Sequence, residues 1–196
     1  MRYNLSELTD IIEDRRTIYP EQFSSRKVHK EIISKLLNAA KWAPTHKLTQ
    51  PWNFTVFMDK GTSTFGQWHA EAYKNAVSES DFNQKMYTKI RDRAERSAAV
   101  IVVAMKRDDA LRVPEIEEIA STAAAIQNMA LLATAYGLGF YWGTGGMAYS
   151  PEMKTYLGLG ENDKVMGMLF IGYPEIEWPR KTPRRPIEYF SKFIEE

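Results

Sequence analysis

The stretch that decides the fold runs from Ile119 to Tyr136 and reads IASTAAAIQNMALLATAY. It is apolar around nearly the whole circumference of a helix, and its few polar side chains are Ser121, Thr122, Gln127, Asn128 and Thr134. Gly137 follows and can adopt the left-handed conformation that ends many helices. Such a helix must be buried on most sides, either within the core or in a subunit interface.

Other apolar segments have the length and pattern of strands. Ala98 to Met105 is a continuous run with three valines and an isoleucine, which is typical of a buried, central strand. Further strands are expected at Asn53 to Met58, Phe140 to Trp142 and Val165 to Tyr173.

Helices are expected between these strands. One begins behind Asn4 or Ser6 and ends near Arg15-Arg16, one covers Val28 to Trp42 before Pro44, and one opens at Ser150-Pro151-Glu152 and closes near Gly158. The densely charged stretch Asp59 to Arg96 predicts solvated helices with isolated aromatic residues. Strands separated by helices indicate an α+β or α/β domain.

Composition excludes several classes of protein. The 196 residues suit one domain, and Lys plus Arg minus Asp plus Glu is 26 − 25 = +1, so no global field attracts nucleic acid or an anionic membrane. The absence of cysteine removes disulfides and thiolate chemistry, and three scattered histidines make a metal site improbable. No apolar run is long enough to span a membrane. We therefore expect a single cytoplasmic domain over 1–196.

The sequence lacks the usual short motifs for nucleotides, zinc and hydrolysis. There is no phosphate-binding Gly-x-x-x-x-Gly-Lys loop, no Gly-x-Gly-x-x-Gly after a strand, no His-Glu-x-x-His and no Gly-x-Ser-x-Gly. What remains are polar segments in apolar surroundings: Arg15-Arg16-Thr17, Thr45 to Gln50, Trp142 to Gly146, and Arg184-Arg185.

Each of these segments has two interpretations. Two arginines followed by a hydroxyl suit a phosphate monoester, but they could instead complement the end of a helix and pair with Glu13 or Asp14. His46 could be an ordinary turn histidine. The glycines after Trp142 let backbone N–H groups approach a ligand, or form a simple turn.

Together the segments resemble the FMN-dependent nitroreductase family, and the Pro44-Thr45-His46-Lys47 loop resembles its small, minimal branch. The resemblance covers nearly the whole chain outside 59–96. It is carried, in order, by Arg15-Arg16-Thr17, Ala43 to Trp52, Ala124 to Asn128, Gly137-Leu138-Gly139, Trp142-Gly143-Thr144, Gly167 to Gly172 and Arg184-Arg185-Pro186.

The resemblance implies an α+β, three-layer fold around a mostly antiparallel sheet. It also implies an intertwined homodimer with two FMN sites at the subunit interface. In that arrangement 59–97 is a helical excursion covering the active site, and 174–196 is an extension onto the partner subunit.

The resemblance also implies roles for particular residues. Arg15 and Arg184 would hold the FMN phosphate, with Arg16 and Thr17 along the phosphate and ribityl chain and Arg185 in reserve. Thr45, His46 and Gln50 would come from the other subunit or line the flavin's edge. Trp142, Gly143 and Thr144 would run along the isoalloxazine ring. No side chain is implied as a catalytic acid or base, and no metal is implied.

Two positions depart from the family pattern. Tyr19 stands where a cation is usual, and Leu48 stands where an amide is common. Because reduced FMN carries negative charge near N1, these departures bear on its reduction potential.

The implied activity is a ping-pong transfer of hydride from NADH or NADPH to FMN, and then to a nitroaromatic, quinone or similar small electron acceptor. An alternative is a flavin carrier or redox sensor without useful turnover. A third possibility keeps the fold but performs another flavin reaction, such as dehydrogenation.

Overall fold

The computed structural model describes residues 3–195, so residues 1, 2 and 196 of the predicted domain lie outside it. Its centre is a four-stranded antiparallel sheet in the order β1-β2-β4-β3. The strands are β1 Trp52–Met58, β2 Ala99–Met105, β3 Gly139–Gly143 and β4 Lys164–Gly172. All four predicted strands are confirmed, and every residue of β2 is buried.

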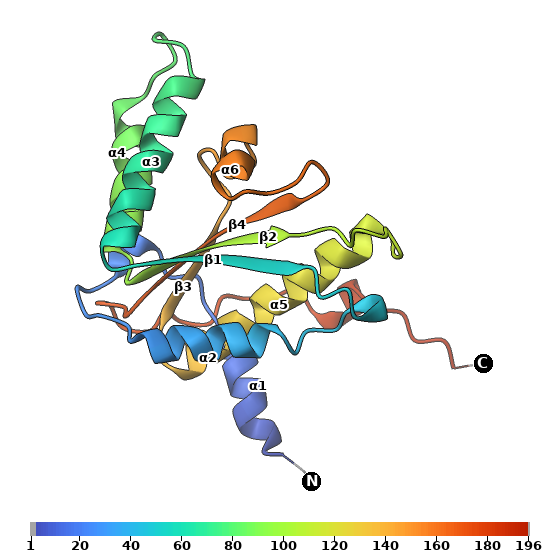
Figure 1. Ribbon diagram of the computed structural model, residues 1–196. Coiled ribbons are helices and arrows are strands. Elements are labelled where there is room, and N and C mark those ends of the chain that lie inside the picture. Colours follow the sequence, from blue (N-terminus) through green and yellow to red (C-terminus); the bar gives the residue numbers. More distant parts are fainter. Residues whose placement is uncertain (1–2, 196) are drawn as a thin grey trace.

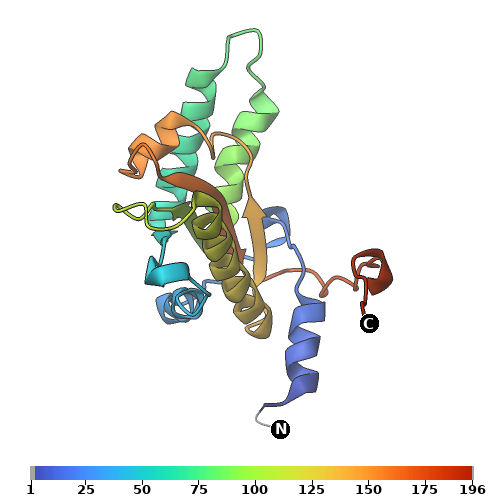
Figure 2. The same ribbon diagram turned by 90° about the vertical axis from the view of Figure 1, so that its right-hand side faces the viewer.

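Helices cover both faces of the sheet and make three layers (Figures 1 and 2). The α-helices are α1 Leu5–Asp14, α2 Lys30–Ala40, α3 Lys60–Ala76, α4 Gln84–Arg96, α5 Glu115–Ala135 and α6 Pro151–Tyr156. Short 3₁₀ turns lie at η1 Pro20–Gln22, η2 His46–Leu48 and η3 Ile187–Tyr189. The expected α+β fold is therefore confirmed.

Two cores lie on opposite sides of the sheet because side chains alternate along a strand. Ile101 and Val103 of β2 pack with α2 and α5 on one face. Val100 and Val102 pack with α3, α4 and α6 on the other. The side chains of β3 alternate in the same way, so neighbouring residues of this strand face opposite sides of the sheet.

Capping residues mark where several of the helices begin and end. Asn4 accepts hydrogen bonds from the backbone N–H groups of Ser6 and Glu7, and Ser150 accepts one from Met153. Gly137, with φ of 65°, ends α5 in the left-handed conformation, as predicted. The start of α5 differs from the prediction: it begins at Glu115 behind Pro114, because three acidic residues in the first turn suit the positive end of a helix dipole.

The stretch between β1 and β2 is less solvated than its charge suggests. Phe65 is fully buried and stacks on Phe57 of β1, with ring centroids 4.5 Å apart. Trp68 stacks on Tyr156 of α6 at 3.8 Å. These aromatic residues are thus part of the core, whereas the far end of the α3–α4 hairpin projects from the body (Figure 1).

Part of the molecular surface is strongly apolar. In α1, no residue is buried, and the predicted apolar face of Leu5, Leu8 and Ile12 is exposed. The C-terminal segment carries further exposed apolar side chains, Ile187, Tyr189, Phe190, Phe193 and Ile194. Within residues 3–195, no helix has the length and apolarity needed to cross a membrane.

Candidate functional site

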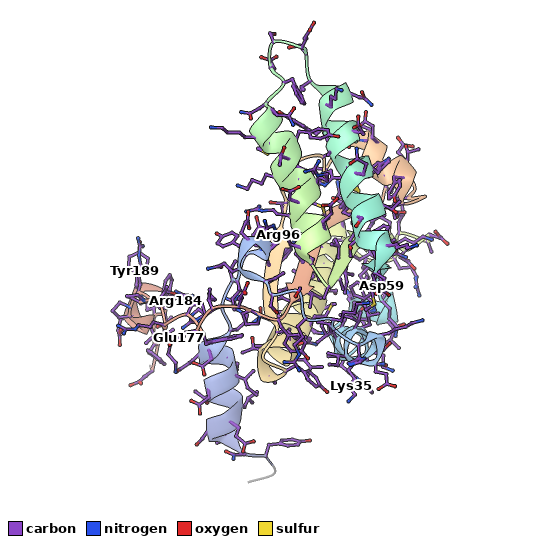
Figure 3. All side chains as sticks on the ribbon, turned by 90° about the vertical axis from the view of Figure 1, so that its left-hand side faces the viewer. Lys35, Asp59, Arg96, Glu177, Arg184 and Tyr189 are labelled. Carbon is purple, nitrogen blue, oxygen red and sulfur yellow. The ribbon has the colours of Figure 1, made fainter. Side chains whose placement is uncertain are left out.

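Three arginines meet where α1 ends. Arg15 caps α1, and Arg184 lies on the C-terminal segment beside that end of the helix (Figure 3). Burial lowers the pKa of Arg15, and the positive charges of Arg16 and Arg184 lower it further. In the described part of the chain, none of these three guanidinium groups forms an ion pair with a carboxylate. The cluster is therefore positive and uncompensated.

The alternative role for the arginine pair holds in part: Arg16 complements the carbonyl end of α1, but in residues 3–195 neither arginine pairs with the carboxylate of Glu13 or Asp14. The carboxylates of Glu13 and Asp14 face Lys181, whose Nζ lies 2.7 and 3.5 Å from them. Arg16 instead donates to the backbone carbonyl oxygens of Glu13, Arg15 and Arg180, at 2.6, 2.7 and 3.2 Å. Because carbonyl groups carry no net charge, the positive charge remains available to an anion such as a phosphate.

A cavity of about 500 Å³ opens beside this cluster, within the size range of ligand sites. The segment after α1 runs parallel to β3, with a bridge between Thr17 and Phe140. This pairing brings the arginine end of the segment against the middle of α5. The lining residues come from these three elements: Arg15, Thr17, Ile126, Gln127, Ala130, Phe140, Trp142 and Thr144.

Trp142 forms a wall of the cavity. Its Nε1–H donates to the carbonyl oxygen of Met166 at 2.8 Å, and this bond fixes the indole at the sheet edge. The indole also lies against Gly167, where an added Cβ would be 2.6 Å from Nε1. Gly167 has a φ of 126°, so both its conformation and its close approach require glycine. The cavity thus has a cationic end and a flat wall.

Gly143 lies on the opposite side of β3 from Trp142. A Cβ there would approach the Tyr141 ring at 2.9 Å, so this face of the strand leaves no space for a side chain. The turn after β3 separates the first cavity from a second hollow of about 200 Å³ under α4. Of the expected ring-contacting residues, Trp142 and Thr144 therefore line the first cavity, and Gly143 lines the second.

His69 is a buried residue that lines the second hollow. The N–H of Met147 donates to its Nε2 at 2.9 Å, which requires that nitrogen to be unprotonated. Burial lowers the pKa of His69 to about 4, so the side chain is neutral near pH 7. We assign it a structural role, supporting the Gly145-Gly146 turn from below.

The predicted loop residues Thr45, His46 and Gln50 lie elsewhere in the chain. His46 is 2.5 Å from Glu117, in the first turn of α5. Glu117 and Gln127 are ten positions apart on this helix, which corresponds to about 15 Å along its axis. A single chain therefore does not bring His46 to the arginine cavity.

The two departures from the family pattern have distinct surroundings. The Tyr19 ring packs against the Tyr141 ring in a tilted arrangement, with centroids 4.9 Å apart, and the guanidinium of Arg93 lies 5.6 Å from the Tyr19 ring. A cation from α4 thus stands near the position where the sequence lacks one. Leu48 is 75% exposed.

Two site residues were not predicted. Gln127 lines the cavity, and the signal in the sequence was an amide in a largely apolar helix, within the stretch Ala124 to Asn128 that carries the resemblance. Glu117 had no signal of its own, because its contact with His46 joins residues far apart in sequence. Within residues 3–195, no group of three or more His, Cys, Asp or Glu side chains is arranged to hold a metal ion.

Fold and site together define an α+β protein with a cluster of arginines beside a ligand-sized cavity at the edge of an antiparallel sheet. The sequence profile of the nitroreductase family matches residues 12–173. The chain therefore belongs to the nitroreductase family and is an enzyme of that family.

Similar proteins carry descriptions from the same family. The chain is 30% identical over 182 residues to "Putative NAD(P)H nitroreductase YfhC" of Bacillus subtilis, covering 93% of this chain and 91% of the relative. It is 31% identical over 147 residues to the Escherichia coli K12 relative YdjA, which has the same description, covering 75% and 78%. A crystal structure of a nitroreductase-like family protein from Bacillus cereus superposes with a TM-score of 0.82, at 32% identity and 100% and 99% coverage.

Proposed function

We propose that this chain is an FMN-dependent NAD(P)H oxidoreductase that reduces nitroaromatic compounds, quinones or similar small electron acceptors in the cytoplasm. The observation that carries the proposal is the cluster of Arg15, Arg16 and Arg184 beside the cavity. Three like charges with no carboxylate partner in the described chain favour a bound phosphate.

Different residues of the cavity would contact the phosphate, the ribityl chain and the ring of FMN. The arginines would bind its phosphate, Thr17 would hydrogen-bond the ribityl chain, and the segment from Trp142 to Thr144 would lie along the ring. Gln127 offers both an amide donor and an acceptor to the same ligand. When bound, FMN supplies the redox chemistry, accepting hydride from NADH or NADPH and passing two electrons to the acceptor in a ping-pong scheme.

The cavity's own composition agrees with a cofactor that performs the chemistry. No lining residue is a carboxylic acid, histidine, lysine or tyrosine, so the described cavity offers no general acid or base. The chain's contribution is to bind and orient flat rings. A structure from Desulfovibrio desulfuricans with a similar fold, TM-score 0.71 and 22% identity, is that of "a putative nitroreductase in complex with fmn".

We propose that the complete site forms in a homodimer. His46 lies at the first turn of α5 and the arginine cavity lies against the middle of that helix, so a partner subunit must supply Thr45, His46 and Gln50 if they contact the same ligand. The exposed apolar faces of α1 and the C-terminal segment supply surface for such a partner. The 174–196 segment would then extend over the second subunit.

The absorbance spectrum of the purified protein tests the proposal. We expect flavin bands at about one FMN per chain and loss of these bands after anaerobic addition of NADH or NADPH. A protein that binds FMN but is not bleached would instead be a carrier or redox sensor. A colourless protein that takes up no added FMN would contradict the proposal.

A further inference from the structure

The loop that carries His46 is held in one unusual conformation. Lys47 and Leu48 have φ values of 50° and 53°, a region that residues other than glycine seldom occupy. The N–H of Thr49 donates to the carbonyl oxygen of His46 at 3.2 Å, and Lys47 Nζ donates to the carbonyl oxygen of Arg112 at 2.9 Å. The surrounding contacts therefore determine the strained turn, as at many binding sites.

Glu117 binds one nitrogen of the His46 ring. Its Oε2 lies 2.5 Å from Nδ1. Because an ionised carboxylate only accepts hydrogen bonds, Nδ1 must carry a proton and donate it. Nε2 has no hydrogen-bond partner in the part of the chain that the structure describes. In the neutral ring, Nε2 is consequently an acceptor, and only in the protonated ring is it a donor.

The first turn of α5, which carries Glu117, is itself held in place by its neighbours. The next residue, Glu118, is buried and forms an ion pair with Arg107. Its Oε1 also accepts a hydrogen bond from the N–H of Asp108 at 3.1 Å. These bonds fix the first turn of α5 to the segment after β2, so Glu117 can hold His46 in a defined place.

We propose that Glu117 is a positioning residue for ligand recognition: it holds Nδ1–H of His46 and leaves Nε2 as the ring nitrogen that meets the flavin bound by the partner subunit. This inference rests on the proposed function. With the ring neutral, Nε2 would accept a hydrogen bond from an N–H of the flavin's pyrimidine ring. With the ring protonated, it would donate to a neighbouring carbonyl oxygen.

The tautomer of His46 in the flavin-free protein is the first test. Long-range ¹⁵N–¹H correlation spectra, at a pH where imidazole is neutral, distinguish the Nδ1–H form from the Nε2–H form. We expect Nδ1–H in the wild type and conversion to mainly Nε2–H in Glu117→Ala. The matched control is Glu115→Ala, which removes the same charge from the same helical turn and leaves the His46 contact intact. An Nε2–H wild type, or a Glu117→Ala variant that keeps Nδ1–H, overturns the proposal.

FMN affinity tests whether Glu117 acts through His46. We expect Glu117→Ala to weaken FMN binding about 3- to 10-fold, measured by quenching of flavin fluorescence, and Glu115→Ala to leave it unchanged. In a His46→Ala background, Glu117→Ala should have no further effect. An equal further loss would contradict a positioning role. If the wild type binds no FMN, the proposed function and the ligand assigned to Nε2 both fail, whereas the tautomer result still decides whether Glu117 orients His46.

Discussion

Arg15 is a residue whose surroundings oppose its own charge. Its guanidinium is partly buried, and Arg16 and Arg184 add repulsion. We expect Arg15→Gln to weaken FMN binding roughly 10-fold or more, because a charge-assisted hydrogen bond to phosphate contributes about 1.5–3 kcal/mol. In the absence of FMN the same change should leave the melting temperature unchanged or raise it, because it removes repulsion.

Thermal unfolding with and without added FMN measures both effects. Arg91→Gln on α4 is the matched control, because Arg91 pairs with Asp92 at 2.7 Å and lines neither cavity. Equal losses of melting temperature with and without FMN in Arg15→Gln would show that Arg15 serves the fold rather than an anion.

His69 makes a pH-dependent contribution to stability. Its pKa is about 4 in the folded state because of burial, against about 6.5 for an exposed histidine. Below pH 6.5 the unfolded chain therefore binds a proton that the folded chain does not, and stability is lost as the pH falls towards 4. Between pH 7 and 4.5 we expect wild type to lose about 2–3 kcal/mol more than His69→Gln, which retains an acceptor for Met147.

Urea unfolding at the two pH values gives this difference directly. Carboxylates that titrate in the same range affect both proteins, so only the difference between the two losses reports on His69. Parallel losses in wild type and His69→Gln would mean that the imidazole is not buried in its neutral form.

At the scale of elements, the buried pair between Arg107 and Glu118 holds α5 to the segment after β2. Glu118 is 1% exposed, so its removal leaves the Arg107 charge without compensation. We expect Glu118→Gln to lower the free energy of unfolding by about 3–5 kcal/mol. Glu115→Gln, which breaks a half-exposed pair with Lys164 at 3.4 Å, should lower it by less than about 1 kcal/mol in the same urea experiment.

How far the sequence predicts each element depends on whether its signal is local. The apolar run of β2, the cap of α6 and the glycine after α5 are local, and all three predictions are confirmed. The burial of Phe65 depends on Phe57 and Tyr156, which come from other elements, so periodicity within 59–96 missed it. At the site, the family resemblance selected Arg15 and Trp142, which line one cavity, but could not reveal Glu117.

In the whole molecule, the two parts of the candidate site lie about 15 Å apart along one helix. The arginine cavity lies against the middle of α5, and His46 lies against its first turn. In the homodimer that we propose, a two-fold axis would place the same surface of both subunits in contact, so that each partner's loop could complete the other's cavity. The exposed residues Leu5, Leu8 and Ile12 of α1 would give that contact an apolar component. We expect Leu8→Glu to shift the protein towards monomer in sedimentation and to lower FMN affinity together.

Subunit exchange tests this arrangement most sharply. One variant carries Arg15→Gln and Arg184→Gln, and the other carries His46→Ala and Gln50→Ala, so each has one defective half in every site. In a hybrid dimer, one site receives both wild-type halves and the other receives both defects. After random exchange, half of the dimers are hybrids, and about one quarter of all sites should regain wild-type FMN affinity. The fluorescence titration should then show a tight phase that is absent from either variant alone. A site complete within one chain would give no tight phase at any mixing ratio, because no exchange could then combine the two intact halves.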